Sequence, residues 1–113
     1  MTIHASYEHH PDLRCEAIVF IDDECGACFQ IQRDLPAGEY CVTTGASAPV
    51  YGAVTQWRHR DNTFEFALTP KAGRLFGDNL LSFEVTAVET TADELSSHVG
   101  RLLAGVPRLP WSV

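Results

Sequence analysis

The sequence predicts an α+β fold, in which an antiparallel sheet of about six strands is packed by a C-terminal helix and one short helix lies between strands. The first observation is that apolar and polar residues alternate with a period of two over much of the chain, which is typical of strands with one buried face. The second is that only the end of the chain carries a long helical stripe of apolar residues. Because strands come first and the long helix last, the order favours α+β over a doubly wound fold.

The length of 113 residues and the 45% hydrophobic content suit one compact domain and are too small for two. Residues 1–13 are polar and are expected to form a flexible N-terminal arm. Residues 14–105 form the predicted domain. Residues 106–113 form an extended tail, because its prolines cannot continue a helix. Trp111 in this tail either packs back on the sheet or docks on a second copy, which would make a homodimer.

The strands are predicted from apolar runs and from alternation. The run from Ala17 to Ile21 is rich in β-branched and aromatic residues, and these favour a buried strand. Cys25 and Cys28 then flank Gly26-Ala27, which fits a two-residue hairpin turn of type II′. The expected strands are residues 16–22, 28–33, 39–44, 50–59, 64–68 and 80–88.

Both helices have start and stop signals. Thr69 is placed to cap the short helix, Pro70 fits its first turn, and Gly77 suits a left-handed end. The C-terminal helix has Thr91 and Glu94 at the spacing of a capping box. Its apolar stripe is made of Leu95, Val99, Leu102 and Leu103, and Gly105 and Pro107 end it.

The negative charge is concentrated in the first half of the chain. The chain has a formal net charge of −7. Residues 1–56 contain eight aspartates or glutamates but only two arginines or lysines, Arg14 and Arg33. This balance argues against a nucleic-acid partner. It suits a basic protein partner, because complementary charge speeds encounter, but it also suits solubility alone.

Neither a membrane span nor a signal peptide is predicted, because no apolar run reaches about 18 residues and the first 13 residues are polar. A cytoplasmic protein with reduced cysteines is therefore expected. The sequence also lacks a nucleophile elbow and a phosphate-binding glycine motif, so neither an enzyme nor a cofactor is expected.

Cys25 and Cys28 leave one alternative open, a small thiol redox or zinc-binding module. A reactive thiol pair is usually stabilised by nearby cations or a helix N-terminus, whereas this pair follows three carboxylates. Zinc would need more ligands, and Cys15 and Cys41 could complete four, although no second C-x-x-C motif is present. Buried or incidental thiols remain the simpler interpretation.

Several blocks occur in a fixed order between about Cys15 and Ala104. They are Phe29-Gln30-Ile31-Gln32-Arg33, Glu39-Tyr40-Cys41-Val42, Tyr51-Gly52-Ala53-Val54, Leu68-Thr69-Pro70, Leu75-Phe76-Gly77 and a final helix with acidic residues in its first turn. In these blocks the chain resembles the tenth immunity-protein family of bacterial polymorphic toxin systems. It departs from that pattern at Ala53, where a second glycine is expected, and in the cysteine pair of the first hairpin.

The resemblance implies a small cytoplasmic protein that binds a cognate toxin domain and neutralises it by occlusion, without turnover and without a cofactor. A few well-packed anchors on a rigid scaffold would supply most of the affinity. The candidate toxin-binding residues are Asp22, Asp23, Glu24, Asp34 and Glu39, with Tyr51 and Trp57 as aromatic anchors. The alternatives are core packing for the two aromatic residues and a solvated hairpin end for the carboxylates.

Overall fold

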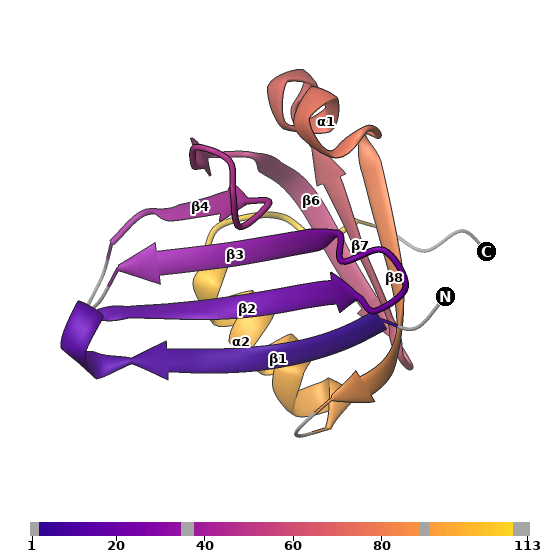
Figure 1. Cartoon of the computed structure of the whole chain (residues 1–113), viewed down its shortest axis with the longest axis horizontal. Helices are drawn as coiled ribbons and strands as arrows, with labels where there is room; N and C mark the ends of the chain where they lie inside the picture. The colour runs from indigo at the N-terminus through magenta and orange to yellow at the C-terminus, as the bar shows by residue number, and fades with distance from the viewer. Residues whose placement is uncertain (1–2, 35–37, 89–90, 110–113) are drawn as a thin grey trace.

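The structure is a computed structural model that describes residues 3–34, 38–88 and 91–109. Its described residues form one curled, mixed sheet of eight strands in the order β5-β4-β3-β2-β1-β8-β7-β6, with two α-helices and one 3-10 turn (Figure 1). The elements are β1 (Ile3–His10), a 3-10 turn (Pro11–Leu13), β2 (Cys15–Asp22), β3 (Cys28–Asp34), β4 (Tyr40–Thr43), β5 (Val50–Tyr51), β6 (Val54–Arg60), β7 (Thr63–Leu68), α1 (Pro70–Phe76), β8 (Leu80–Val88) and α2 (Ala92–Leu102). The α+β class is confirmed, whereas the strand number and the purely antiparallel sheet are wrong.

The first of the two strands that the sequence did not predict is β1, which occupies most of the predicted N-terminal arm. It pairs antiparallel with β2 along its whole length, from Ile3 opposite Asp22 to His10 opposite Cys15. Ile3 and Ala5 are buried against the core. Every second residue of this strand faces away from the core and is polar. The segment as a whole is therefore polar, and for this reason the sequence did not predict a strand here.

The second added strand arises because the predicted strand 50–59 divides into β5 and β6. The chain turns at Gly52, whose φ is +64°, and Ala53 is fully buried. β5 and β6 are consecutive in the chain but form the two edge strands of the sheet. The short turn between them therefore requires the sheet to curl, which brings its two edges close together. The Tyr40 hydroxyl connects β4, the neighbour of β5, to β6, because it accepts a hydrogen bond from the Val54 N–H and donates one to the Val54 carbonyl, each at 3.1 Å.

The sheet is mixed because β1 pairs in parallel with β8. The register shifts between Ile3 and His4, and the Thr86 side chain lies at this irregularity. Its hydroxyl accepts a hydrogen bond from the Ile3 N–H and donates one to the Ile3 carbonyl, each at 3.1 Å. Backbone groups displaced by the shift therefore keep partners. A pairing between residues 83 positions apart has no local signal in the sequence.

The turn between β2 and β3 is longer than the predicted two-residue hairpin. Ile21 pairs with Cys28, and the Asp22 N–H donates to the Ala27 carbonyl at 2.9 Å. The Gly26 N–H donates to the Asp22 carbonyl at 2.7 Å. Cys25 therefore lies in an exposed loop and not opposite Cys28 in a ladder, so the type II′ prediction is wrong.

The helix signals are confirmed. The Thr69 hydroxyl accepts a hydrogen bond from the Ala72 N–H, and Gly77 ends α1 with a φ of +86°. Thr91 caps α2 by accepting from the Glu94 N–H at 3.1 Å. The predicted stripe of Leu95, Val99, Leu102 and Leu103 is buried.

The core lies between α2 and the inner face of the curled sheet. Figure 1 shows α2 behind β1, β2 and β3, with β6 to β8 crossing these strands steeply. Five phenylalanines from both halves of the sheet stack or tilt against one another, with ring centroids 4.9 to 6.3 Å apart: Phe20, Phe29, Phe64, Phe66 and Phe83. These aromatic contacts join the two halves of the sheet in one core.

The beginning of the C-terminal tail pairs with the edge of β6. The Trp57 N–H donates to the Pro107 carbonyl at 3.3 Å, and the Leu109 N–H donates to the Trp57 carbonyl at 2.8 Å. The Arg108 guanidinium lies 3.8 Å from the centre of the Trp57 ring. Residues 107–109 are thus extended and lie along the side of β6 that no other strand of the described sheet occupies. Trp111 lies outside the described residues.

Deleting residues 107–113 is expected to leave a folded domain that is less stable by about 1–3 kcal/mol, because two backbone hydrogen bonds and one cation–π contact are lost. Urea denaturation of the full-length and shortened proteins measures this difference. Arg108→Ala removes the ring contact alone and should account for only part of it. Equal midpoints for all three proteins would contradict the tail contacts.

Candidate protein-binding surface

The face of the sheet opposite α2, here called the outer face, is polar where it crosses β3 and β4. Along β3, the buried Phe29 and Ile31 alternate with Gln30, Gln32 and Asp34. Because successive strand residues point to opposite faces, the latter three lie on the outer face. Thr43 and Cys41 of β4 pair with Gln30 and Gln32, so they share that face.

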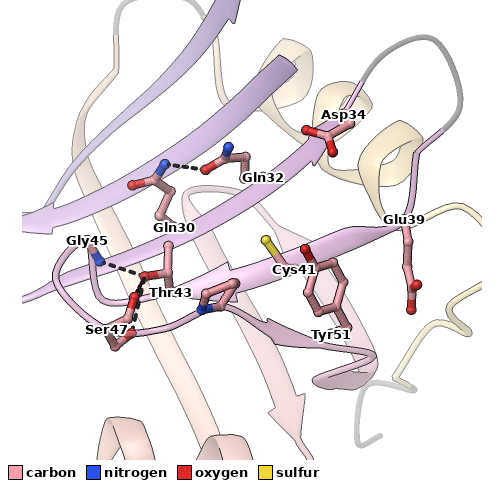
Figure 2. A pocket seen from close by; sticks show the side chains of 10 residues that line it. Gln30, Gln32, Asp34, Glu39, Cys41, Thr43, Gly45, Ser47 and Tyr51 are labelled. Atoms are coloured by element: carbon pink, nitrogen blue, oxygen red, sulfur yellow. Dashed lines mark hydrogen bonds between the residues drawn. The ribbon is translucent and has the colours of Figure 1, made fainter. Parts of the chain in front are cut away.

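A hollow of about 310 Å³ crosses β3, β4 and β5 on this face. We call it the polar groove. Figure 2 shows the glutamines along β3, with Asp34 and Glu39 at one end and Gly45 and Ser47 at the other. It is lined by Gln30, Gln32, Asp34, Glu39, Cys41, Thr43, Gly45, Ser47, Pro49 and Tyr51.

Hydrogen bonds fix the shape of the groove wall at its loop end. The Thr43 hydroxyl donates to the Ser47 carbonyl at 3.0 Å and accepts from the Gly45 N–H at 3.1 Å. Thr44 and Ser47 bond reciprocally, because each side-chain oxygen accepts from the other residue's backbone N–H. On β3, the Gln30 amide donates to the Gln32 side-chain oxygen at 3.2 Å. Such side-chain-to-backbone bonds give the loop a defined conformation.

The other end of the groove is negatively charged. Asp34 and Glu39 are exposed, and within residues 3–34, 38–88 and 91–109 neither carboxylate has a hydrogen-bond or ion-pair partner. Tyr51 is 56% exposed beside them. Burial, and to a smaller extent the Asp34 charge, raises the pKa of the Cys41 thiol, which therefore stays neutral. The groove thus offers hydrogen-bonding groups, one aromatic ring and negative charge that is unpaired among the described residues.

The remaining predicted acidic residues lie elsewhere, at the end of β2 and in the loop before β3. This loop leads into the first residue of β3, and Asp34 is the last. Because β3 has seven residues, the loop and the acidic end of the polar groove lie about 20 Å apart. Here the Asp22 carboxylate accepts the Glu24 N–H at 2.9 Å. The Asp23 carboxylate is 2.6 Å from the His4 ring. The five predicted acidic residues therefore form two separate sites, and those of the loop already have internal contacts.

Trp57 is not at the surface. Its side chain is 1% exposed and packs near Phe66, with the ring centroids 6.5 Å apart. A Cβ atom at Gly100 of α2 would lie 3.6 Å from the indole, so the helix passes close to it. In this structure Trp57 therefore lies in the core, as its alternative interpretation expects, and is not exposed as a binding anchor would be.

The four cysteines do not form a cluster. Cys15 and Cys41 are buried, Cys28 is half-buried and Cys25 is exposed, and all four are free thiols. Burial, and to a smaller extent the Glu8 charge, raises the pKa of the Cys28 thiol. Over the described part of the chain, no three histidine, cysteine, aspartate or glutamate side chains are placed to hold a metal ion.

A buried ionic cluster on the inner face was not predicted. Glu16 is 2% exposed, and its carboxylate accepts from Arg33 at 2.8 Å, Arg101 at 2.6 Å and the Tyr7 hydroxyl at 2.9 Å. His98 of α2 stacks on Tyr7, with ring centroids 3.7 Å apart. We call these five residues the Glu16 cluster. It joins β1, β2 and β3 to α2, so its role is to hold the helix on the sheet.

Some of these features have signals in the sequence. The alternation of Gln30, Gln32 and Asp34 with apolar residues indicates a polar face on β3. Glu16 lies two residues before Ile18, so it falls on the inward side of a buried strand, where a charge needs a partner. Its partners Arg33 and Arg101 come from distant parts of the chain, and the sequence does not pair them.

Comparisons of the chain with protein-family models, with curated proteins and with solved structures find no match. Among the helices of the described residues, none has the length and apolar content needed to cross a membrane.

Proposed function

We propose that this chain is an immunity protein that binds a cognate bacterial toxin domain in the cytoplasm and neutralises it by occlusion. The polar groove is its binding surface. The observation that carries the proposal is the pair of exposed carboxylates of Asp34 and Glu39, which lie at the end of a groove built on β3 to β5 and have no partner among the described residues. The resemblance in the sequence blocks supplies the class of partner.

The physical argument rests on charge and rigidity. Asp34 and Glu39 attract a basic surface and disfavour an acidic one, which raises the association rate and the specificity. Tyr51 adds an exposed ring of the kind that often supplies a large share of binding energy. Because the groove lies on paired strands and a hydrogen-bonded loop, little conformational entropy is lost on binding. Occlusion needs only this surface and no chemical step.

Purification of the tagged protein from its native host, with mass spectrometry of bound proteins and a zinc assay on the same sample, tests the proposal. A stoichiometric toxin domain whose activity returns after dissociation is the expected result. Stoichiometric zinc without a protein partner would contradict the proposal and favour the cysteine-based alternative.

A further inference from the structure

A second hollow lies on the other side of the loop that borders the polar groove. Its volume is about 410 Å³, and it separates the loop before β5 from helix α1. We call it the apolar hollow. The residues that form its two walls are Ala48, Pro49 and Val50 from the loop and β5, and Lys71, Arg74 and Leu75 from α1. The volume suits one bulky side chain with its backbone.

The rim of the apolar hollow is positive in a chain of net charge −7. Lys71 and Arg74 are exposed and stand three residues apart on α1, so they lie on the same side of the helix. In the part of the chain that the structure describes, neither has an ion-pair or hydrogen-bond partner.

Most other cations in the structure are already engaged. Arg33 and Arg101 bind the Glu16 carboxylate, and Arg58 binds Glu65 at 2.6 Å. Arg108 lies over the Trp57 ring. The two cations of α1 are therefore available to an external group, directly beside an apolar wall where Leu75 is 38% exposed.

We propose that the apolar hollow is a docking site for a segment of another protein that carries one apolar side chain flanked by carboxylates. The apolar side chain would contact Pro49, Val50 and Leu75, and the carboxylates would lie near Lys71 and Arg74. Charge complementarity selects this occupant. Two cations are fewer than the cluster that draws a protein to an anionic membrane. Copies of a chain with net charge −7 repel one another, which disfavours a second copy.

This docking site is independent of the proposed function, because it lies across the loop from the polar groove and has the opposite charge. The two surfaces share only the loop residues Ser47 and Pro49. One partner that spans both surfaces must therefore present a basic region to the groove and an acidic, apolar region to the hollow.

The test is a two-dimensional amide NMR titration of the full chain with an acetylated and amidated tripeptide, Glu-Leu-Glu. Shifts are expected at residues 47, 48, 50 and 71–75, with millimolar affinity, since exposed charge pairs are individually weak. The peptides Gln-Leu-Gln and Glu-Gly-Glu should each bind roughly five- to tenfold more weakly, because one lacks the charges and the other the apolar side chain.

Matched variants separate the hollow from general charge attraction. The double variant Lys71→Gln and Arg74→Gln should weaken Glu-Leu-Glu binding roughly five- to tenfold, whereas Arg14→Gln with Arg60→Gln, which removes the same charge elsewhere, should not. Equal binding of all three peptides, shifts at other residues or no shifts would overturn the proposal. Self-association that the Lys71 and Arg74 variant abolishes would also overturn it, because the occupant would then be a second copy.

Discussion

Replacing Glu16 with glutamine is expected to lower the free energy of unfolding by about 3–5 kcal/mol. The substitution keeps the shape of the side chain but leaves Arg33, whose side chain is 15% exposed, without its buried counter-charge. Arg101 loses the same partner, so the attachment of α2 to β2 weakens. Urea denaturation at neutral pH measures the effect, and an unchanged m-value shows that the same fold unfolds.

The same carboxylate gives stability a defined dependence on pH. Burial alone would raise the pKa of Glu16, but hydrogen bonds from Arg101, Arg33 and Tyr7 outweigh it and lower the pKa from 4.5 to about 2. A depressed pKa adds stability that is fully present above the unfolded value and is lost as the pH falls through the folded value. The difference between the native protein and Glu16→Gln should therefore be constant above about pH 4.5 and shrink towards pH 2.

The control for this prediction is Glu65→Gln, which breaks the simpler ion pair with Arg58. The side chains of this pair are 13% exposed for Glu65 and 17% exposed for Arg58. Because water reaches both side chains, the substitution should lower the free energy of unfolding by only about 1 kcal/mol. A loss at Glu16 no larger than that at Glu65, or one that persists unchanged at pH 2, would mean that the Glu16 cluster does not fasten α2.

Trp57→Ala is expected to lower the free energy of unfolding by about 3–5 kcal/mol, because it removes the largest fully buried side chain of the described core and leaves a cavity. The ring contact with Arg108 is lost as well. The exposed Tyr51 supplies the comparison, since Tyr51→Ala should change stability by only about 0.5 kcal/mol. Thermal and urea denaturation of the two variants measures both values.

Trp57→Phe keeps part of the core filled and so tests the binding role separately. Because Trp57 is 1% exposed, this variant should bind a partner as well as the native protein does. A stable Trp57→Phe protein that binds poorly would restore the interpretation of Trp57 as an anchor and contradict its place in the core.

The elements with local signals could be predicted from the sequence. Strand β7 alternates cleanly, and the caps at Thr69 and Thr91 lie within three or four residues of the groups they bond. Strand β1 could not be identified, because its inward residues are few and its polar side faces outward. Its parallel pairing with β8 joins residues 3–5 to residues 85–88, which lie far apart in the chain, and one sequence holds no information on such a contact.

The candidate surface could be predicted only in part. The sequence identifies the acidic residues by type, but their division between the loop at Asp23 and the groove at Asp34 depends on the length of β3 and on how its ends are placed. Trp57 and Tyr51 are both aromatic residues in one predicted strand. The turn at Gly52 places them on separate strands, one in the core and the other exposed.

The affinity of the proposed toxin partner, once purified, for two matched charge variants tests the central claim most directly. Asp34→Asn with Glu39→Gln removes two carboxylates from the polar groove, and Asp23→Asn with Glu24→Gln removes two from the loop before β3. The groove variant should bind at least about tenfold more weakly at low salt, and the loop variant should differ by less than about threefold. The reverse order, or native affinity for both variants, would contradict the groove as the binding surface.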